Sequence, residues 1–185
     1  MIHTKDDLNR FLTKDNNLLF SENRRQHEMY MKKTKDTRYL IDIYLKYLRK
    51  EEYYRNKTNQ NFFTRLFGLL FERKRNRLGE KTGFCMEINC FDEGLTIFHC
   101  GSIVVNPNSK IGKNCMLHGN NCIGNNGKTD KCPTIGNNVE IGFGAVIIGD
   151  VEIADNIKVG ANAVVNKSFL EPGITIAGVP AKRVK

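Results

Sequence analysis

The C-terminal half of the chain repeats an aliphatic residue at intervals of six positions, with one double interval. The series is Val105, Ile111, Leu117, Ile123, Ile135, Ile141, Ile147, Ile153, Val159 and Val165. An α-helix has 3.6 residues per turn and would scatter these side chains around its circumference. Six-residue steps instead suit a coil of short strands in which each aliphatic residue points inward. The pattern therefore predicts a parallel β-coil.

The residue two positions before each aliphatic should also point inward, because side chains alternate along a strand. Most of these residues are small or apolar: Ser109, Cys115, Val139, Ala145, Val151, Ile157 and Ala163, with Asn121 as the exception. Between Ile123 and Ile135 the middle aliphatic residue is missing, and segment 125–133 is rich in Asn, Gly, Lys and Asp. This composition predicts a loop that leaves the coil, and loops on rigid scaffolds often carry functional sites.

Residues 1–83 show helical spacing instead. Thr4 and Asp7 form a capping signal for a first helix, and apolar residues at every third or fourth position predict further helices over 38–54 and 61–77. Gly79 and Gly83 should end the last helix. We expect part of the apolar face of residues 62–71 to cover the open end of the coil, whose strand edges would otherwise be unpaired.

Composition divides the chain at the same place. Residues 1–83 hold 20 Lys and Arg against 11 Asp and Glu, whereas residues 84–185 hold nine of each, so the formal net charge of +9 belongs to the first part. Of the 16 glycines, 13 follow residue 83. We therefore predict a mainly β protein with a basic α-helical region over residues 1–83 and a β-helix domain over residues 84–185.

The chain begins with charged residues and contains no apolar run long enough to span a membrane, so we expect neither a secretory signal nor a spanning helix. The six cysteines include no Cys-x-x-Cys pair, which argues against a zinc framework. We expect reduced thiols, no metal requirement and a cytoplasmic protein, with the inner face of the membrane as a second setting.

Several motifs carry a family resemblance: residues 98–105, 141–145, 159–165 and 176–182. They resemble those of the hexapeptide-repeat acyltransferases and are similar to the serine acetyltransferase branch. The resemblance implies a left-handed parallel β-helix, a homotrimer or a dimer of trimers, and acetyl-coenzyme A (acetyl-CoA) as the acyl donor. The chain departs from serine acetyltransferases at two places, where Phe98-His99 replaces Asp-His and Lys131-Cys132-Pro133 replaces Arg-His-Pro.

A second subgroup looks closer, namely the serine-acetyltransferase-like enzymes of capsule and surface-polysaccharide gene clusters. The similarity lies in the short basic N-terminal region, in residues 89–105, in Leu117-His118 and in residues 164–168. We therefore predict an O-acetyltransferase that acts on a sugar hydroxyl of a surface or capsular polysaccharide or its precursor. The alternatives are serine O-acetylation and a non-catalytic trimeric scaffold. His99 and the closing motif at 176–182 count against the scaffold.

Acetyl transfer to a hydroxyl needs a base, and the neutral imidazole of a histidine suits this role at pH 7. Of the four histidines, only His99 and His118 lie on the coil. The resemblance implies that His99 is the catalytic base, and we predict that His118 and Lys131 bind the acceptor, although a surface role for His118 has equal weight. A carboxylate should orient the base. The candidates are Glu87, Asp92 and Glu93.

The resemblance also implies where coenzyme A would lie. Gly144, Ala145 and Ala161 match positions at which small residues let the pantetheine arm approach, and Asn166, Lys167 and Lys182 match polar and basic contacts. Glycine and alanine at these corners also fit the needs of the turns alone.

The basic N-terminal region contains no nucleic-acid-binding motif, so we expect no nucleic-acid partner. Residues 62–77 combine several phenylalanines with a basic run, Arg73 to Arg77. This segment is either a solvated face or a surface for an acidic glycan or an anionic membrane leaflet.

Overall fold

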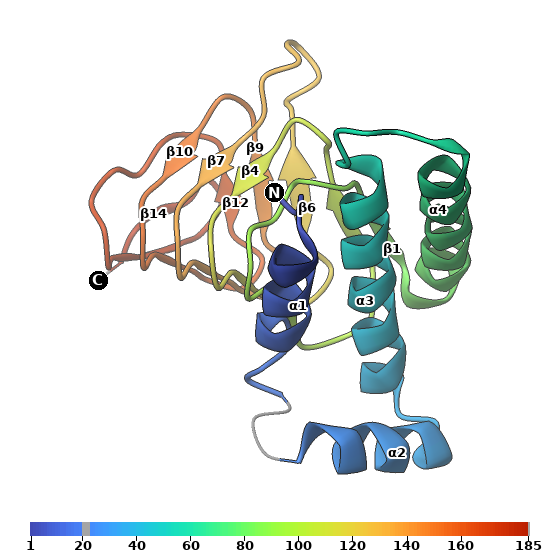
Figure 1. The fold of residues 1–185 in the computed structure, drawn as a ribbon. Helices are drawn as coiled ribbons and strands as arrows, with labels where there is room; N and C mark the ends of the chain where they lie inside the picture. The colour runs from blue at the N-terminus through green and yellow to red at the C-terminus, as the bar shows by residue number, and fades with distance from the viewer. Residues whose placement is uncertain (20–22, 185) are drawn as a thin grey trace.

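The computed structural model describes residues 1–19 and 23–184. Four helices occupy the N-terminal part of these residues and stand at one end of a coil of strands (Figure 1). Their bounds are α1 Lys5–Lys14, α2 Arg24–Thr34, α3 Thr37–Arg55 and α4 Phe62–Thr82. The capping box predicted at Thr4 and Asp7 is present at the start of α1.

The coil consists of short strands that follow α4 directly. They are β1 Phe84–Met86, β2 Thr96–Ile97, β3 Ile103–Val105, β4 Lys110–Ile111, β5 Met116–Leu117, β6 Cys122–Gly124, β7 Thr134–Ile135, β8 Glu140–Ile141, β9 Val146–Ile148, β10 Glu152–Ile153, β11 Lys158–Val159, β12 Val164–Val165, β13 Thr175–Ala177 and β14 Lys182–Arg183. The predicted loop projects between β6 and β7 at the top of Figure 1.

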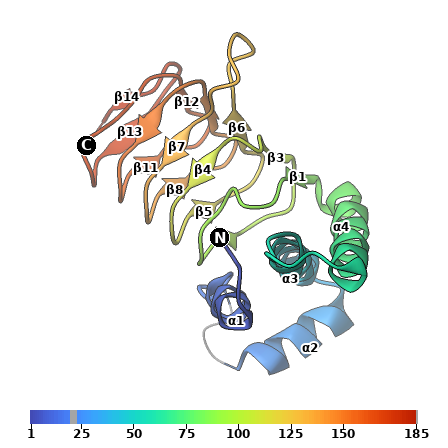
Figure 2. The same ribbon diagram turned by 45° about the horizontal axis from the view of Figure 1, so that its top comes forward.

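These strands form three sheets that make the sides of the coil (Figure 2). Sheet A has the order β1-β3-β6-β9-β12, sheet B has the order β10-β7-β4, and sheet C has the order β14-β13-β11-β8-β5-β2. All pairings within them are parallel except that of β13 with β14. From β3 to β11 the chain passes through sheets A, B and C in turn, which confirms the parallel coil predicted from the period of six.

The interior of the coil is filled by the residues that the period of six selects. All ten aliphatic residues of the series are buried, and so are the small residues two positions before them. Asn121 is also buried, and its side-chain amide forms hydrogen bonds with backbone groups inside the coil. Its Oδ1 accepts a hydrogen bond from the Gly119 N–H, and its Nδ2 donates to the Gly142 carbonyl at 2.8 Å. The polar exception in the pattern is therefore satisfied within the core.

Three edges run along the coil where the chain turns from one sheet to the next. The His99 edge joins sheet C to sheet A and contains residues 98–102, 118–121, 142–145 and 160–163. The loop edge joins sheet A to sheet B and contains residues 106–109, 125–133, 149–151 and 166–168. The asparagine edge joins sheet B to sheet C, and there Asn114, Asn138 and Asn156 have positive φ and link their amides in a ladder.

Helix α3, and not the first half of α4, closes the first turn of the coil. Its buried residues Ile41, Tyr44, Leu45 and Leu48 belong to the same hydrophobic core as the coil interior. The Tyr44 ring packs edge-on against Phe84 in β1, with the centroids 5.2 Å apart. The prediction that residues 62–71 cover the coil end is therefore wrong, since the regular apolar stripe of α3 does so.

Helix α4 lies against α3 and is longer than predicted. It continues beyond Arg77 to Thr82, with Gly79 inside it, and Gly83 ends it in the left-handed conformation. Phe67 and Phe71 stack on Tyr54 of α3, whereas Phe62 and Phe63 are exposed. Within the described residues, no helix is both long and apolar enough to cross a membrane.

Helix α2 is the element that the sequence pattern missed. Its apolar residues Met29, Tyr30 and Met31 are consecutive and so form no stripe at helical spacing, and of these Met31 is buried. Asn23 at its N-terminus makes no side-chain capping bond. The helix is held by ion pairs to α3, where Arg24 and Lys46 both contact the carboxylates of Glu28 and Asp42.

Candidate active site

His99 lies on the His99 edge, between β2 and β3, with its side chain exposed on the single chain. The neighbouring turn of the coil passes beside it at Gly119. A Cβ at position 119 would lie 3.4 Å from the His99 Cβ and 3.3 Å from the Phe143 ring, and the φ of Gly119 is +115°. Glycine therefore keeps the surface beside the imidazole open at a backbone angle that other residues rarely adopt.

His118 directly follows β5, on the turn of the coil next to that of His99, and its ring lies beside Phe98. The Phe98 and His118 rings are stacked with centroids 4.7 Å apart, and the His118 Nε2 lies 3.0 Å from Oε1 of Glu140. Lys158 also contacts Glu140, at 3.2 Å. Although burial opposes ionisation, these hydrogen bonds from His118 and Lys158 lower the pKa of Glu140. The His118 ring is thus held between an aromatic ring and a carboxylate at the border of the His99 edge.

The carboxylates expected to orient His99 lie elsewhere. Glu93 pairs with Arg10, Lys14 and Lys113 at the asparagine edge. The Asp92 carboxylate accepts the Glu93 N–H, and Glu87 follows β1 at the opposite side of sheet A. None of these three candidate groups lies on the His99 edge, so none of them orients His99 within one chain.

The helical region supplies charged groups beside the His99 edge that the sequence analysis did not consider. The Cys100 Sγ lies 3.9 Å from the carbonyl oxygen of Thr37, at the start of α3. Burial and the Asp36 carboxylate raise the pKa of the Cys100 thiol. Asp36 caps α3 through the Arg38 N–H and also accepts from the Arg38 guanidinium at 2.6 Å.

The sequence could have identified Asp36 as a helix cap, since an Asp-Thr pair precedes the apolar stripe of α3. It carries no signal that this cap lies beside Cys100, which comes more than 60 residues later in the chain. The packing of α3 on the first turn of the coil brings the start of this helix to Cys100, the residue after that histidine.

The residues predicted to contact coenzyme A divide between the edges. Gly144 and Ala161 lie on the His99 edge, whereas Asn166 and Lys167 lie on the loop edge with Lys131, which pairs with Asp150 at 2.5 Å. Ala145 faces the coil interior and is fully buried, so its side chain serves packing. Lys182 lies in β14, at the last turn of the coil, and is exposed.

Gly144 also has a structural reason to be glycine. Its φ is +73°, and a Cβ there would lie 2.1 Å from the Oδ1 of Asn162 on the next turn of the coil. The turn itself therefore requires glycine at this position.

An outward-facing row of apolar residues on sheet A separates the His99 edge from the loop edge. Strand register aligns one residue from each strand in this row: Cys85, Val104, Cys122, Val146 and Val164. Val104 is 42% exposed, and part of the row lines a hollow of about 350 Å³ with Asn106 and Asn125. One chain alone therefore presents an unpartnered apolar sheet face between the two groups of predicted site residues.

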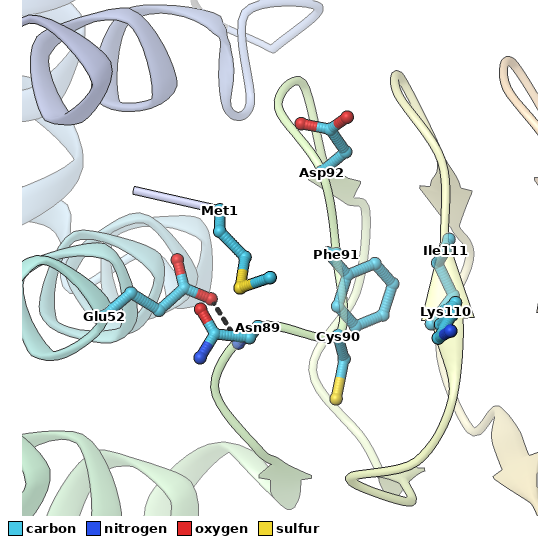
Figure 3. A pocket seen from close by; sticks show the side chains of 8 residues that line it. All are labelled: Met1, Glu52, Asn89, Cys90, Phe91, Asp92, Lys110 and Ile111. Carbon is cyan, nitrogen blue, oxygen red and sulfur yellow. Dashed lines mark hydrogen bonds between the residues drawn. The ribbon is translucent and has the colours of Figure 1, made fainter. Parts of the chain in front are cut away.

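A smaller hollow of about 140 Å³ lies where α3 and the N-terminus meet the first turns of the coil (Figure 3). The Glu52 carboxylate in its wall already has partners, since it accepts the Asn89 N–H and pairs with Arg49. Burial raises the pKa of the Cys90 thiol in its wall to about 12, so this thiol is protonated near neutral pH. The Cys90 thiol is therefore not a candidate nucleophile.

Comparison with known proteins follows the same division of the chain. Residues 132–167 match the family model described as bacterial transferase hexapeptide (six repeats). A serine acetyltransferase of Helicobacter pylori strain 26695 is 37% identical over 93 residues, which are 49% of this chain and 54% of that protein. The chain thus spans about half the length of the curated relatives it matches.

Two solved structures extend the likeness. Soybean serine acetyltransferase complexed with serine has 22% identity and a TM-score of 0.74, and the match covers 97% of this chain and 70% of that chain. A serine acetyltransferase in complex with CoA has 25% identity and a TM-score of 0.63, and covers 78% of this chain and 57% of that chain. The fold is a left-handed β-helix. The prediction made from the hexapeptide motifs is therefore confirmed.

The same comparisons correct the predicted acceptor. Relatives and neighbours from several organisms are serine acetyltransferases, so the prediction of a polysaccharide O-acetyltransferase is wrong. Phe98 and Cys132 differ from the residues of the serine enzymes, and this difference had favoured another acceptor. In the structure Phe98 stacks on His118. The replacement of an acid by Phe98 therefore does not by itself exclude serine as the acceptor.

Proposed function

We propose that the protein transfers the acetyl group of acetyl-CoA to the hydroxyl of L-serine. The observation that carries the proposal is the exposed His99 at an open edge of a coil whose relatives are serine acetyltransferases. The likeness to a structure with bound CoA supports the donor. Gly144 and Ala161, on the same edge as His99, would border the pantetheine arm, and Asn166, Lys167 and Lys182 would meet polar groups of the coenzyme.

His99 acts as the general base. Its imidazole takes the proton of the serine hydroxyl, and the oxygen forms a bond to the thioester carbonyl carbon. When the tetrahedral intermediate collapses, the carbon–sulfur bond breaks and the imidazolium returns the proton to the departing thiolate. The products are O-acetylserine and free coenzyme A, so atoms and charges balance without a further reactant.

Recognition of free serine requires partners for an ammonium and a carboxylate, because a charge left unpaired in a site is costly. Asp36, whose carboxylate acts on the thiol of Cys100, the residue after His99, forms an ion pair with Arg38, so the pair offers one group of each sign. We assign the Asp36 carboxylate to the ammonium of serine and the Arg38 guanidinium to its carboxylate. His118, fixed by Phe98 and Glu140, borders the same acceptor site.

The active unit is a homotrimer. Within one chain, Lys131 and Lys167 are separated from His99 by the width of sheet A, which carries the apolar row around Val104. Packing of this row against a neighbouring copy would bury it and bring the loop edge of one chain towards the His99 edge of the next. Closed threefold symmetry would then repeat one complete site at each interface.

The test is an acetyl-transfer assay with the purified chain, acetyl-CoA and L-serine, in which the released coenzyme A thiol is measured. We expect thiol release with L-serine and none above background with L-alanine, which has the same charged groups but lacks the hydroxyl. Mass spectrometry should identify O-acetylserine as the product. Equal release with both amino acids, or no release with either, would reject the proposal.

A further inference from the structure

The exposed face of α4 begins with a concentration of apolar side chains. Phe62 is 74% exposed and Phe63 is 65% exposed, and Leu66, Leu69 and Leu70 continue the same surface over the next two turns. The two phenylalanine rings contact each other at 5.7 Å. Phe62 and Phe63 do not hold α4 against α3, because other residues of the helix, including Phe67 and Phe71, make that contact. Figure 1 shows α4 on the outer side of α3.

Basic side chains border these apolar residues along the same helix. Arg65 lies among them, and Arg73, Arg77 and Lys81 follow on the exposed face over the remaining turns. An open hollow on this face is lined by Leu70, Arg73, Lys74, Asn76, Arg77 and Glu80. We call this surface the α4 patch, and its members are Phe62, Phe63, Arg65, Leu66, Leu69, Leu70, Arg73, Arg77 and Lys81.

Two basic residues of the predicted run do not belong to the patch. Arg75 is buried, pairs with Glu51 at 2.7 Å and donates to the Met86 carbonyl, so it joins α4 to α3 and β1. Lys74 lies over the rings of Tyr47 and Phe71. Of the two acidic residues of α4, Glu72 pairs with Arg55, and Glu80 is exposed beside Arg73 and Arg77. The four basic residues of the patch therefore outnumber the one carboxylate beside them.

We propose that the α4 patch binds the surface of an anionic phospholipid bilayer. Arginine and lysine are attracted to lipid phosphates, and exposed aromatic and aliphatic side chains gain free energy by entering the boundary between headgroups and acyl chains. Because three of the four basic residues follow the apolar ones along the axis of α4, the helix meets the surface obliquely, with the Phe62 end inserted and the Arg73 to Lys81 end on the headgroups.

Charge favours this occupant over a second copy of the chain. Two copies of the patch packed face to face would bring Arg65, Arg73, Arg77 and Lys81 towards four like charges, and such a contact is unfavourable. An anionic surface instead matches the basic residues and accepts the apolar ones. The inference is independent of the proposed acetyl transfer, because none of these residues lies on the His99 edge.

The chain contains no tryptophan, which permits a direct measurement of insertion. In the variant Phe63→Trp, the single indole reports its own surroundings. We expect its emission to shift to shorter wavelength when the full chain meets vesicles of phosphatidylcholine mixed with phosphatidylglycerol, and to stay unchanged with phosphatidylcholine alone. Vesicle co-sedimentation of the wild-type chain should show the same preference and should weaken as salt rises, since charges are screened over about 8 Å at physiological ionic strength.

Two sets of substitutions separate the apolar and basic contributions. Phe62→Ser with Phe63→Ser should weaken vesicle binding by about tenfold or more. Arg73→Gln, Arg77→Gln and Lys81→Gln together should weaken it by roughly 100-fold. The matched control removes the same charge from exposed positions on other helices, through Lys5→Gln, Lys32→Gln and Lys33→Gln, and should bind as the wild type does.

Each outcome decides the proposal. Binding that prefers anionic vesicles and is lost only in the patch variants supports it. Absence of vesicle binding by the wild-type chain overturns it, and so does equal loss in the lysine control. Light scattering of each variant tests the other occupant: a larger assembly that dissociates when Phe62 and Phe63 are changed, without vesicle binding, would place a second copy on the patch. Circular dichroism confirms that the exposed substitutions leave the fold intact.

Discussion

The guanidinium of Arg49 and the carboxylate of Asp15 form an ion pair at 2.7 Å inside the junction between the helices and the coil. Arg49 is fully buried and also pairs with Glu52 and donates to the carbonyl oxygens of Phe91 and Asp92. Asp15 in turn accepts the N–H groups of Gly94 and Leu95. One buried charged network therefore joins α1, α3 and the first turn of the coil.

Removal of Arg49 should destabilise this junction strongly. Arg49→Met keeps much of the side-chain volume but leaves Asp15 and Glu52 buried without their cation, so we expect a loss of about 3–5 kcal/mol in the free energy of unfolding. Urea denaturation followed by circular dichroism measures it. Arg25→Met, at an exposed position of α2, is the control and should change stability little. Equal stability of the two variants would contradict a structural role for the network.

A second contact between the helices and the coil should make stability depend on pH. Burial alone would raise the pKa of Glu93, but hydrogen bonds from Lys14 and Arg10 lower it from 4.5 to about 2. Its contribution is therefore complete above pH 4.5 and is lost as the pH falls towards 2, because the unfolded chain takes up the proton first. Thermal unfolding across this range should show the loss, and Glu93→Gln should reduce the slope.

The apolar row on sheet A makes the proposed trimer testable. Val104→Glu places a charge in the middle of this row, and burial of that charge between copies would be costly. We expect the variant to elute as a folded monomer and to lose acetyl transfer, because the loop edge of a neighbour no longer reaches His99. Leu170→Glu introduces the same charge at an exposed residue outside the row and should leave the trimer intact. A monomeric wild-type chain would reject the trimer.

The coil could be predicted in detail because its residues repeat one local environment. Each aliphatic position of the period meets the same inward geometry, so the sequence identifies strands, core and the loop at 125–133 together. Asn121 broke the pattern without breaking the fold, since its amide finds backbone partners inside the coil. Corner positions were less readable, because asparagine and glycine both adopt positive φ there.

The helical region and the site could be predicted only in part, for a different physical reason. Spacing identifies an apolar stripe but not the surface that it meets, so the cover of the coil end was assigned to residues 62–71 of α4 when α3 provides it. The contact of Cys100 with Thr37 depends on how α3 is docked on the coil. Likewise, Phe98 differs from the acid of serine acetyltransferases in sequence, yet only the structure shows that it stacks on His118.

Acetyl transfer should depend on His99 more than on any other side chain of the coil. His99→Ala removes the proposed base, and loss of a general base typically lowers the rate by about 10²–10⁴-fold. The coenzyme A thiol assay with saturating L-serine measures this loss. His27→Ala is the matched control, at an exposed position of α2. Wild-type activity in the His99 variant would remove this residue from the mechanism, provided that both proteins elute as the same oligomer.

The charged pair beside Cys100 should determine the apparent affinity for serine without affecting the donor. Asp36→Asn retains a good helix cap for α3 but removes the carboxylate charge, and Arg38→Gln removes the guanidinium. Since a hydrogen bond to a charged group contributes about 1.5–3 kcal/mol, we expect either change to raise the KM for serine by roughly tenfold or more.

The KM for acetyl-CoA should stay unchanged in both variants, which separates acceptor recognition from a general distortion of the site. Arg183→Gln breaks a comparable exposed pair, with Glu171, at the far end of the coil and serves as the control. If Asp36→Asn and Arg38→Gln raised both KM values equally, the pair would position α3 against the coil and would not contact serine. If they changed neither value, the ammonium and carboxylate of serine would have to find their partners on a neighbouring chain.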